Sequence, residues 1–291
     1  MPCAAVFMQR ARPLAETWQG DAPPGHHRLG PADWLRVVLR GVPLGTVVFG
    51  GLAVMLLVRL IEYPLNGARR PVTPYITQAV CRAAFLILGM RFRSIGAPMR
   101  GPGAVVANHA SWLDIFALNT RKRIYFVAKS EVAGWPGIGW LARATGTVFI
   151  RRDRAEVRDQ IALFKERLAA DHTLLFFPEG TSTDGLRVLP FKPSLFAAFF
   201  APDMRERMRI QPVTLVYDAP EGEDARFYGW WGDMDFGPHL LSTLAARRHG
   251  AVTVIYHPVV AVADYPDRKS LAKAMEAQVR AGLSQHGAAE V

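Results

Sequence analysis

The chain has 291 residues, of which 50% are hydrophobic, and a formal net charge of +10. This apolar content can bury a sizeable core, which excludes a disordered chain and a small disulfide-dependent scaffold. The cysteines, Cys3 and Cys81, are far apart, which excludes a disulfide framework and fits a reducing compartment. The charge suits anionic partners, but the sequence has no zinc-finger, RNP or basic-zipper pattern, and we expect no nucleic-acid partner.

Residues 1–31 form the first predicted unit, a loose N-terminal arm. Gly20–Pro31 is rich in Gly, Pro and His, and no strong periodicity precedes it. The start of the chain lacks the ordered regions of a secretory signal, so we expect no export.

Residues 32–95 are predicted to form a membrane-associated helical hairpin. Gly41–Val58 is an uncharged apolar run, which as a helix would be roughly 27 Å long, slightly short of a bilayer core. Its proline and glycines favour a membrane helix, with a helix buried in a soluble core as the alternative. Tyr75–Met90 is apolar around a central Arg82, which we expect to reach the membrane interface. The basic residues that flank the first segment are evenly split, so they do not determine its orientation.

Residues 96–265 are predicted to form an α/β domain, because short β-rich segments alternate with helical patterns. Pro212 lies inside one expected strand, which suggests an edge or an end of the sheet. The expected strands are 103–108, 123–129, 146–151, 173–180, 209–217 and 251–260, and the stripe of one helix is Val157, Ile161, Phe164 and Leu168. Residues 266–291 are predicted to form a C-terminal amphipathic helix with an apolar face of Leu271, Met275, Val279 and Leu283.

A histidine and an aspartate lie five residues apart in the stretch VVANHASWLDIFAL, residues 105–118. Ser111 and Asp114 are spaced like a helix N-cap and its reciprocal partner, so His109 is expected in the preceding loop, where its ring can turn back to the Asp114 carboxylate. Such a carboxylate holds one imidazole nitrogen and leaves the other to accept a proton from a hydroxyl. His109 is therefore a candidate general base. The alternative is that Asp114 only caps the helix and His109 only packs there.

Two further segments carry candidate binding residues. Gly146–Arg152 is a Gly-led strand ending in two arginines, and Arg152 suits an anionic ligand, although strand-end arginines are commonly only solvated. The apolar strand that begins at Leu174 stops at Pro178 and turns into Glu179, Gly180 and Thr181. This loop has groups for cradling an oxyanion or a glycerol-type headgroup, with a plain strand-to-helix turn as the alternative.

In this order the segments resemble the motifs of the phospholipid and lysophospholipid acyltransferases, typified by bacterial 1-acylglycerol-3-phosphate acyltransferase. Asn108 through Asp114 matches the His-x4-Asp box, Gly146–Arg152 the second motif, Phe177–Thr181 the third, and Pro212 part of a fourth. The resemblance implies a glycerolipid-acyltransferase-type α/β domain, with a mixed sheet flanked by helices, beside an N-terminal membrane-associated helical pair.

The resemblance also implies the substrates and the site. The donor is an acyl thioester on acyl carrier protein or coenzyme A, the acceptor is a lysolipid in the membrane, and no bound cofactor or metal is expected. His109 is the base and Asp114 orients it, while the acceptor site is lined by Arg152, Glu179, Gly180 and Thr181. A rival mechanism uses Ser111 as a covalent nucleophile.

Two departures concern the acceptor. Ser182 stands where enzymes acylating lysophosphatidic acid commonly carry arginine, and Arg151 replaces a usual acidic residue. Several stretches, including FPEGTSTDG and FYGWWGDMDFGPH, are most similar to the branch that acylates lyso-ornithine lipid in α-proteobacteria. This similarity favours O-acylation of lyso-ornithine lipid at the inner membrane with the catalytic domain facing the cytoplasm. Lysophosphatidic acid is the alternative acceptor, and use of both acceptors is a further alternative. An inactive basic membrane-binding protein is the non-enzyme alternative.

Overall fold

The computed structural model describes residues 18–25, 28–135, 137–150 and 157–286. Its strands are β1 (Arg91–Ile95), β2 (Gly103–Ala107), β3 (Tyr125–Lys129), β4 (Val148–Ile150), β5 (Thr173–Phe176), β6 (Arg209–Asp218), β7 (Ala251–Tyr256) and β8 (Val260–Ala261). Its α-helices are α1 (Pro31–Asn66), α2 (Thr73–Leu88), α3 (Leu113–Arg121), α4 (Ile138–Thr145), α5 (Val157–Ala169), α6 (Pro202–Arg205), α7 (Phe236–Ala245) and α8 (Arg268–His286), and 3₁₀ turns include η1 (Ser130–Gly134), η3 (Pro193–Phe200) and η4 (Val262–Asp264).

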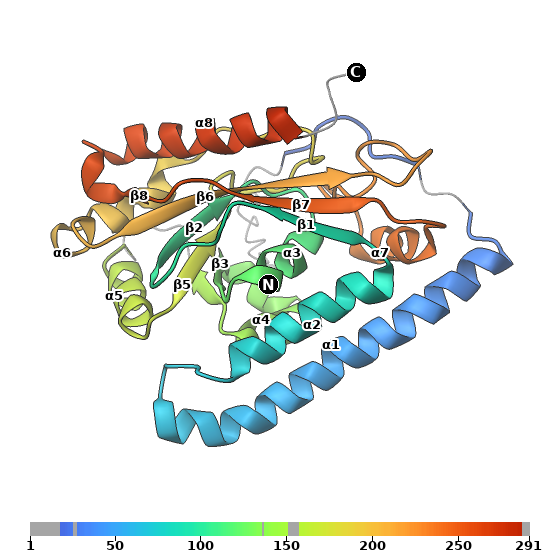
Figure 1. The fold of residues 1–291 in the computed structure, drawn as a ribbon, viewed down its shortest axis with the longest axis horizontal. Helices are drawn as coiled ribbons and strands as arrows, with labels where there is room; N and C mark the ends of the chain where they lie inside the picture. The colour runs from blue at the N-terminus through green and yellow to red at the C-terminus, as the bar shows by residue number, and fades with distance from the viewer. Residues whose placement is uncertain (1–17, 26–27, 136, 151–156, 287–291) are drawn as a thin grey trace, which may run out of the picture.

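The strands form one mixed sheet in the order β1-β7-β6-β2-β5-β3-β4, and β8 pairs with β6 (Figure 1). β7 and β8 run antiparallel to β6, whereas the remaining pairs are parallel. The predicted class, an α/β domain with a mixed sheet flanked by helices, is confirmed.

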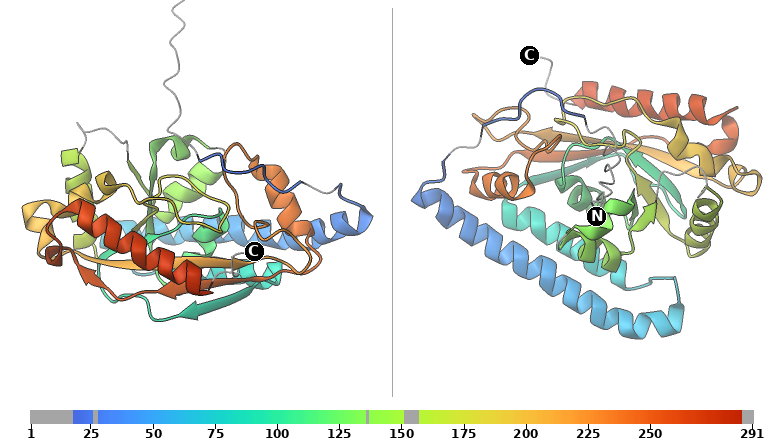
Figure 2. Two further views of the ribbon diagram at one scale, coloured as in Figure 1. Left: turned by 90° about the horizontal axis from the view of Figure 1, so that it is seen from above. Right: turned by 180° about the vertical axis from the view of Figure 1, so that it is seen from behind.

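The core has one apolar layer on each face of the sheet. Val105 and Ala107 of β2 face the layer covered by α1, α2, α3 and α7, whereas Ala104 and Val106 face the layer covered by α5, η3 and α8. This alternation follows from the two-residue period of a strand. Figures 1 and 2 show α8 on the opposite side of the sheet from the helical pair α1 and α2. The four predicted face residues of α8 are buried against the sheet layer, so this helix completes the domain rather than following it.

The first strand was not expected, and it corrects a predicted boundary. β1 pairs with β7 in parallel register from Arg91 to Ile95, so the sheet begins before residue 96. The strand lies at an edge, with its side chains alternating between exposed and half-buried. An edge strand of this kind carries little apolar signal, which is why residues 91–95 were assigned to the hairpin.

Pro212 does not lie in an edge strand, because β6 pairs with β2 on one side and with β7 and β8 on the other. Along β6, Arg209 and Ile210 pair with β8, and pairing with β7 begins only at Val213. The Pro212 carbonyl accepts the N–H of His257 on that side. The N–H that proline lacks therefore falls in the gap between the two ladders, where the sheet does not need it.

The helical pair is present and longer than expected. α1 has 36 residues, its most apolar window has a mean hydropathy of 2.2, and only 11% of that window is buried. This exposure excludes the alternative of a helix buried in a soluble core. α2 packs between α1 and α3, and Arg82 donates from Nε to the Thr120 carbonyl at 3.0 Å. Arg82 is nevertheless an exposed residue, so the expectation that its guanidinium reaches a membrane interface stays a prediction.

Part of the predicted loose arm is docked on the domain. The Trp231 indole donates to the Gln19 carbonyl at 3.1 Å, and the Trp18 ring packs against Trp231 and beneath the Arg187 guanidinium. Residues 1–17, 26 and 27 lie outside the described residues. The docked segment, residues 18–25, has no local sequence signal, because the hydrogen bonds, ion pair and cation–π contact that hold it join it to residues more than 150 positions away.

Candidate active site

The His109 loop follows β2, and the Glu179 loop follows the neighbouring strand β5. Because β2 and β5 are parallel, their carboxyl ends lie at the same edge of the sheet and bring the two loops together. Backbone hydrogen bonds join them, since Thr183 donates its N–H to the His109 carbonyl at 2.8 Å. The sequence motifs separated by about 70 residues thus form one site.

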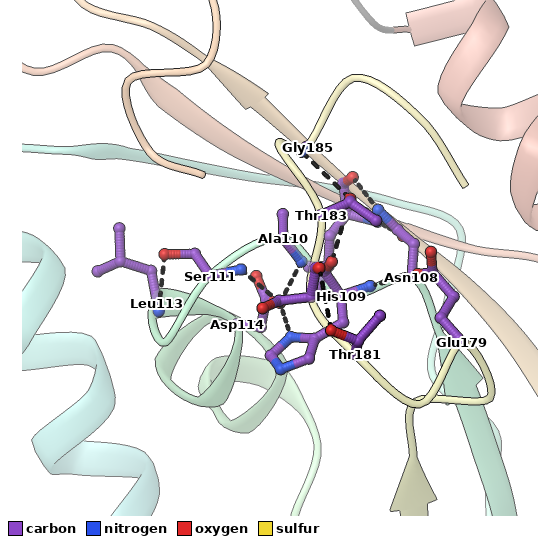
Figure 3. A network of polar contacts seen from close by, with 12 residues as sticks. Asn108, His109, Ala110, Ser111, Leu113, Asp114, Glu179, Thr181, Thr183 and Gly185 are labelled. Atoms are coloured by element: carbon purple, nitrogen blue, oxygen red, sulfur yellow. Dashed lines mark hydrogen bonds and ion pairs between the residues drawn. The ribbon is translucent and has the colours of Figure 1, made fainter. Parts of the chain in front are cut away.

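His109 and Asp114 are in direct contact. Nδ1 of His109 lies 2.7 Å from Oδ2 of Asp114, and Nε2 points away from the carboxylate (Figure 3). Asp114 is fully buried, whereas 23% of the His109 side chain is exposed. The imidazole stacks on the Phe177 ring with centroids 4.0 Å apart. A carboxylate at Nδ1 selects the tautomer with its proton there, which leaves the Nε2 lone pair free on the accessible side.

Asp114 receives donors from the loop, from its own helix start and from the sheet. Its Oδ2 accepts the N–H groups of Ala110 and Ser111 at 2.8 and 3.0 Å, and its Oδ1 accepts the Tyr217 hydroxyl at 2.6 Å. Burial, followed by the Asp114 charge, raises the pKa of Tyr217 well above its ordinary value, so this phenol remains a donor. These donors hold the carboxylate in one orientation.

Ser111 and Asp114 make the expected reciprocal exchange one residue before the N-cap of α3, which is Trp112. The Ser111 hydroxyl oxygen accepts the Leu113 N–H at 3.3 Å, while its own N–H goes to Asp114. Ser111 is fully buried. A buried serine is poorly placed to attack a thioester, which argues against the covalent mechanism.

Glu179 is buried inside the protein, whereas the resemblance implied that it lines the acceptor site. The side chain is only 1% exposed, and its two carboxylate oxygens accept the N–H groups of His109 and Leu189 at 2.7 and 2.6 Å. Burial raises the pKa of Glu179 to about 8. The carboxyl group therefore joins the histidine loop to the segment after the Pro-Glu-Gly turn, and in this arrangement it does not face an open acceptor site as the resemblance implied.

Of the remaining predicted binding residues, the structure describes Gly180 and Thr181. Gly180 turns the chain with a positive φ of 77°, a conformation that favours glycine, and its N–H returns to the Phe177 carbonyl. Thr181 is half-buried, and its hydroxyl lies 3.4 Å from the Trp18 N–H. Arg152 and Arg151 lie outside the described residues, so the structure does not place them.

Two residues that position the dyad were missed. Tyr217 contacts Asp114, and the Asn108 amide makes a two-way exchange with the backbone of Leu215 at 2.8 and 2.9 Å. Both contacts depend on β6 lying beside β2. Tyr217 has no sequence signal beyond ending an expected strand, whereas Asn108 lies in the matched His-x4-Asp box without a role assigned to it.

The mixed sheet, with the His109–Asp114 pair at the carboxyl edge of its parallel strands, defines an α/β protein whose candidate site has the groups to accept a proton from a hydroxyl. Residues 92–216 match the family model described as Acyltransferase. The fold is similar to the crystal structure of the 1-acyl-sn-glycerophosphate (LPA) acyltransferase PlsC from Thermotoga maritima, with a TM-score of 0.61, 21% identity, and coverage of 87% of this chain and 94% of that one.

Two curated relatives are named lyso-ornithine lipid O-acyltransferase. The Rhodobacter capsulatus protein is 57% identical over 268 residues, which are 92% of this chain and 97% of that protein. The Brucella abortus protein is 38% identical over 232 residues, 75% of this chain and 84% of that one. A 1-acyl-sn-glycerol-3-phosphate acyltransferase of Neisseria gonorrhoeae is 32% identical over 179 residues, 61% of this chain and 68% of that one.

The chain belongs to the acyltransferase family of these lysolipid enzymes. It is an acyltransferase, and membership of the family implies a lipid acceptor and an acyl donor in general. The long, exposed apolar helix α1 is consistent with association with a membrane.

Proposed function

We propose that this enzyme transfers a fatty acyl group from an acyl thioester to the free hydroxyl of lyso-ornithine lipid. The relationship to the Rhodobacter capsulatus enzyme supports this acceptor. Ser182, which replaces the arginine common in enzymes acylating lysophosphatidic acid, is consistent with it. The alternative acceptor is 1-acyl-sn-glycerol-3-phosphate, supported by the more distant Neisseria relative.

The observation that carries the mechanism is the imidazole held at Nδ1 by Asp114 with Nε2 on the open side. Nε2 of His109 takes the proton of the acceptor hydroxyl as its oxygen bonds to the thioester carbonyl carbon. The tetrahedral intermediate then collapses, the carbon–sulfur bond breaks, and the imidazolium returns its proton to the leaving thiolate. The buried Asp114 stabilises the imidazolium, and no acyl-enzyme is formed.

We assign the other residues by their placement. Gly180 and Thr181 line the acceptor side, and Arg152 is proposed to meet the acceptor headgroup on the resemblance alone. Glu179 positions the His109 loop through the two backbone N–H groups it accepts. The base is also positioned by Asp114, which holds its Nδ1 from the start of α3. Tyr217 anchors Asp114 to β6, and Asn108 ties the histidine loop to the backbone of β6.

The donor and the location are also proposed. Acyl carrier proteins are acidic, and the net charge of +10 would steer them to this surface, so we favour acyl carrier protein over coenzyme A. We place the enzyme at the inner membrane with its catalytic domain in the cytoplasm. We expect the transfer rate to fall steeply with salt when acyl carrier protein carries the acyl group, and only weakly when coenzyme A carries it.

The test is an acyl-transfer assay of detergent-purified protein that offers both lysolipids in competition. We expect lyso-ornithine lipid to be used preferentially, and His109→Ala and Asp114→Asn to reduce turnover on the order of 10³-fold or more without unfolding. Wild-type turnover in folded His109→Ala would overturn the base assignment. Preference for lysophosphatidic acid would instead select the alternative acceptor.

A further inference from the structure

Four cationic or titratable side chains meet at the end of β5 that lies away from the active site. We call this set the cationic cluster: Arg59 of α1, Arg70 of the α1–α2 connection, Arg167 of α5 and His172. The His172 N–H donates to the Arg167 carbonyl at 3.0 Å, and the His172 ring stacks on Tyr125, which lines one small cavity together with Arg70. Arg59 donates to the carbonyl of Arg69, next to Arg70, and each arginine acts electrostatically on His172. His172 directly precedes β5 and the Pro-Glu-Gly turn follows it, so the strand separates the cluster from the dyad.

The pairing of these groups is incomplete. Arg59 is satisfied by Glu62 and by the carbonyls of Gly67 and Arg69. Arg70 donates from Nη1 to the Ala144 carbonyl at 2.7 Å, but its buried Nε has no partner. The Arg167 guanidinium makes no hydrogen bond or ion pair within the described part of the chain, and its Nε is buried as well. The cluster therefore holds two guanidinium groups with unused donors.

His172 adds a second, independent observation. The side chain is 3% exposed, and neither ring nitrogen has a partner of normal hydrogen-bond geometry among the described residues; the interaction with the Ala68 backbone is a distorted hydrogen bond. Its ring stacks on Tyr125 with centroids 3.9 Å apart. Buried polar atoms are nearly always bonded, so the N–H of the neutral His172 ring, beside two arginines with unused donors, indicates a missing acceptor.

The acid within electrostatic range of the cluster does not fill this role. Glu62 accepts from the Thr73 hydroxyl at 2.7 Å and the Val72 N–H at 2.7 Å, in addition to Arg59. Its oxygens are thus occupied at the start of α2. A small cavity beside Arg70 is lined by further polar groups, those of Thr73, Thr77, Asn119, Tyr125 and Thr145.

We propose that the cationic cluster is a binding site for a phosphate-type oxyanion, distinct from the active site. An oxyanion has several acceptor oxygens and a negative charge, which match unused Arg donors in a partly desolvated place. The carboxyl-terminal part of α1 next to the cluster exposes Leu60, Ile61 and Leu65 by 72%, 68% and 76%. The oxyanion therefore comes either from the headgroup of an anionic lipid whose tails cover this apolar surface or from free phosphate.

The first experiment uses the full-length protein in a neutral detergent, titrated with inorganic phosphate at constant ionic strength. We expect the thermal unfolding midpoint to rise saturably, and Arg167→Gln to weaken the apparent affinity at least about tenfold, the loss expected for a charged hydrogen bond. Arg268→Gln, which removes an exposed arginine at the start of α8, should behave like wild type. Without phosphate, Arg167→Gln should be at least as stable as wild type, because it removes like-charge repulsion, whereas a purely structural arginine would leave a less stable variant.

The second experiment distinguishes the sources by flotation with phosphatidylcholine vesicles that contain or lack phosphatidylglycerol. If a lipid supplies the oxyanion, Arg167→Gln loses the preference for anionic vesicles and Arg268→Gln keeps it. If only the phosphate response is lost, the site takes a free anion. The proposal is overturned if Arg167→Gln and Arg268→Gln match in both the phosphate response and the vesicle preference.

Discussion

The phenol oxygen of Tyr217 lies 2.6 Å from Oδ1 of Asp114, and both side chains are buried. Tyr217 comes from the central strand β6, whereas Asp114 belongs to the first turn of α3. The carboxylate that holds the imidazole is therefore anchored to the sheet as well as to its own helix. The orientation of the His109 imidazole therefore depends on the packing of β6 beside β2.

Tyr217→Phe should lower kcat about tenfold or more, because it removes one charge-assisted hydrogen bond that orients Asp114. The Michaelis constants of both substrates should change little, since the phenol does not reach the open side of the site. Tyr256→Phe is the matched control, because the buried Tyr256 hydroxyl has no partner within the described residues. If Tyr217→Phe instead raised the KM of a substrate about tenfold and left kcat unchanged, the positioning role would be contradicted.

Glu179→Ala should destabilise the protein by about 2–6 kcal/mol, because the N–H groups of His109 and Leu189 lose their acceptor and each buried loss costs about 1–3 kcal/mol. Glu179→Gln keeps an acceptor for one of them and should be milder. Thermal unfolding measures both. A Glu179→Ala protein with wild-type stability and a raised KM for the acceptor would return Glu179 to the substrate-binding role.

Glu179 also predicts a pH dependence. Burial raises its pKa from 4.5 to about 8, so the folded protein holds a proton that the unfolded chain releases between these values. Stability contributed by this group is fully present below about pH 4.5 and is lost as the pH rises through about 8. Unfolding of Glu179→Gln, compared with wild type across this range, should show a flatter dependence; equal slopes would remove Glu179 as the cause.

His172 predicts the opposite behaviour in acid. Burial, then the charges of Arg167 and Arg70, lower its pKa from 6.5 to about 4, so stability is lost as the pH falls through this window. The difference between these two pKa values corresponds to a loss of roughly 3 kcal/mol in the free energy of unfolding once His172 is fully protonated. His172→Phe keeps the stacking on Tyr125 and should flatten the loss in urea unfolding. His286→Phe, at the exposed end of α8, should retain the loss of stability in acid. If the two variants lose stability equally as the pH falls, His172 is not its cause.

The exposed face of α1 predicts membrane binding through apolar contact. Leu57 and Leu60 are 64% and 72% exposed. Replacing both by Glu should shift the protein from the vesicle fraction to the soluble fraction in flotation, because each change removes about 1.5–3 kcal/mol of apolar transfer and adds a charge. Val259→Glu changes a 39% exposed residue after β7 and should leave partition unchanged. Unaltered partition of the double variant would show that α1 is not the anchor.

The sequence by itself determined the features that are encoded locally. His109, Ser111 and Asp114 lie within six residues, so the capping exchange that turns the imidazole toward the carboxylate is set by one loop and one helix start. The apolar run in α1 and the stripe of α8 are likewise periodic signals of single helices.

The tertiary structure decided everything that joins distant segments. β1 is recognisable only by its pairing with β7, and Pro212 is tolerated in a central strand only because the ladders of β7 and β8 leave a gap there. Tyr217 reaches Asp114, and Glu179 turns inward to the His109 N–H rather than outward to substrate, because β6 and β5 flank β2 in the sheet. Strand order is set by the burial of whole faces and not by any local propensity, so these contacts have no signal in the chain until it is folded.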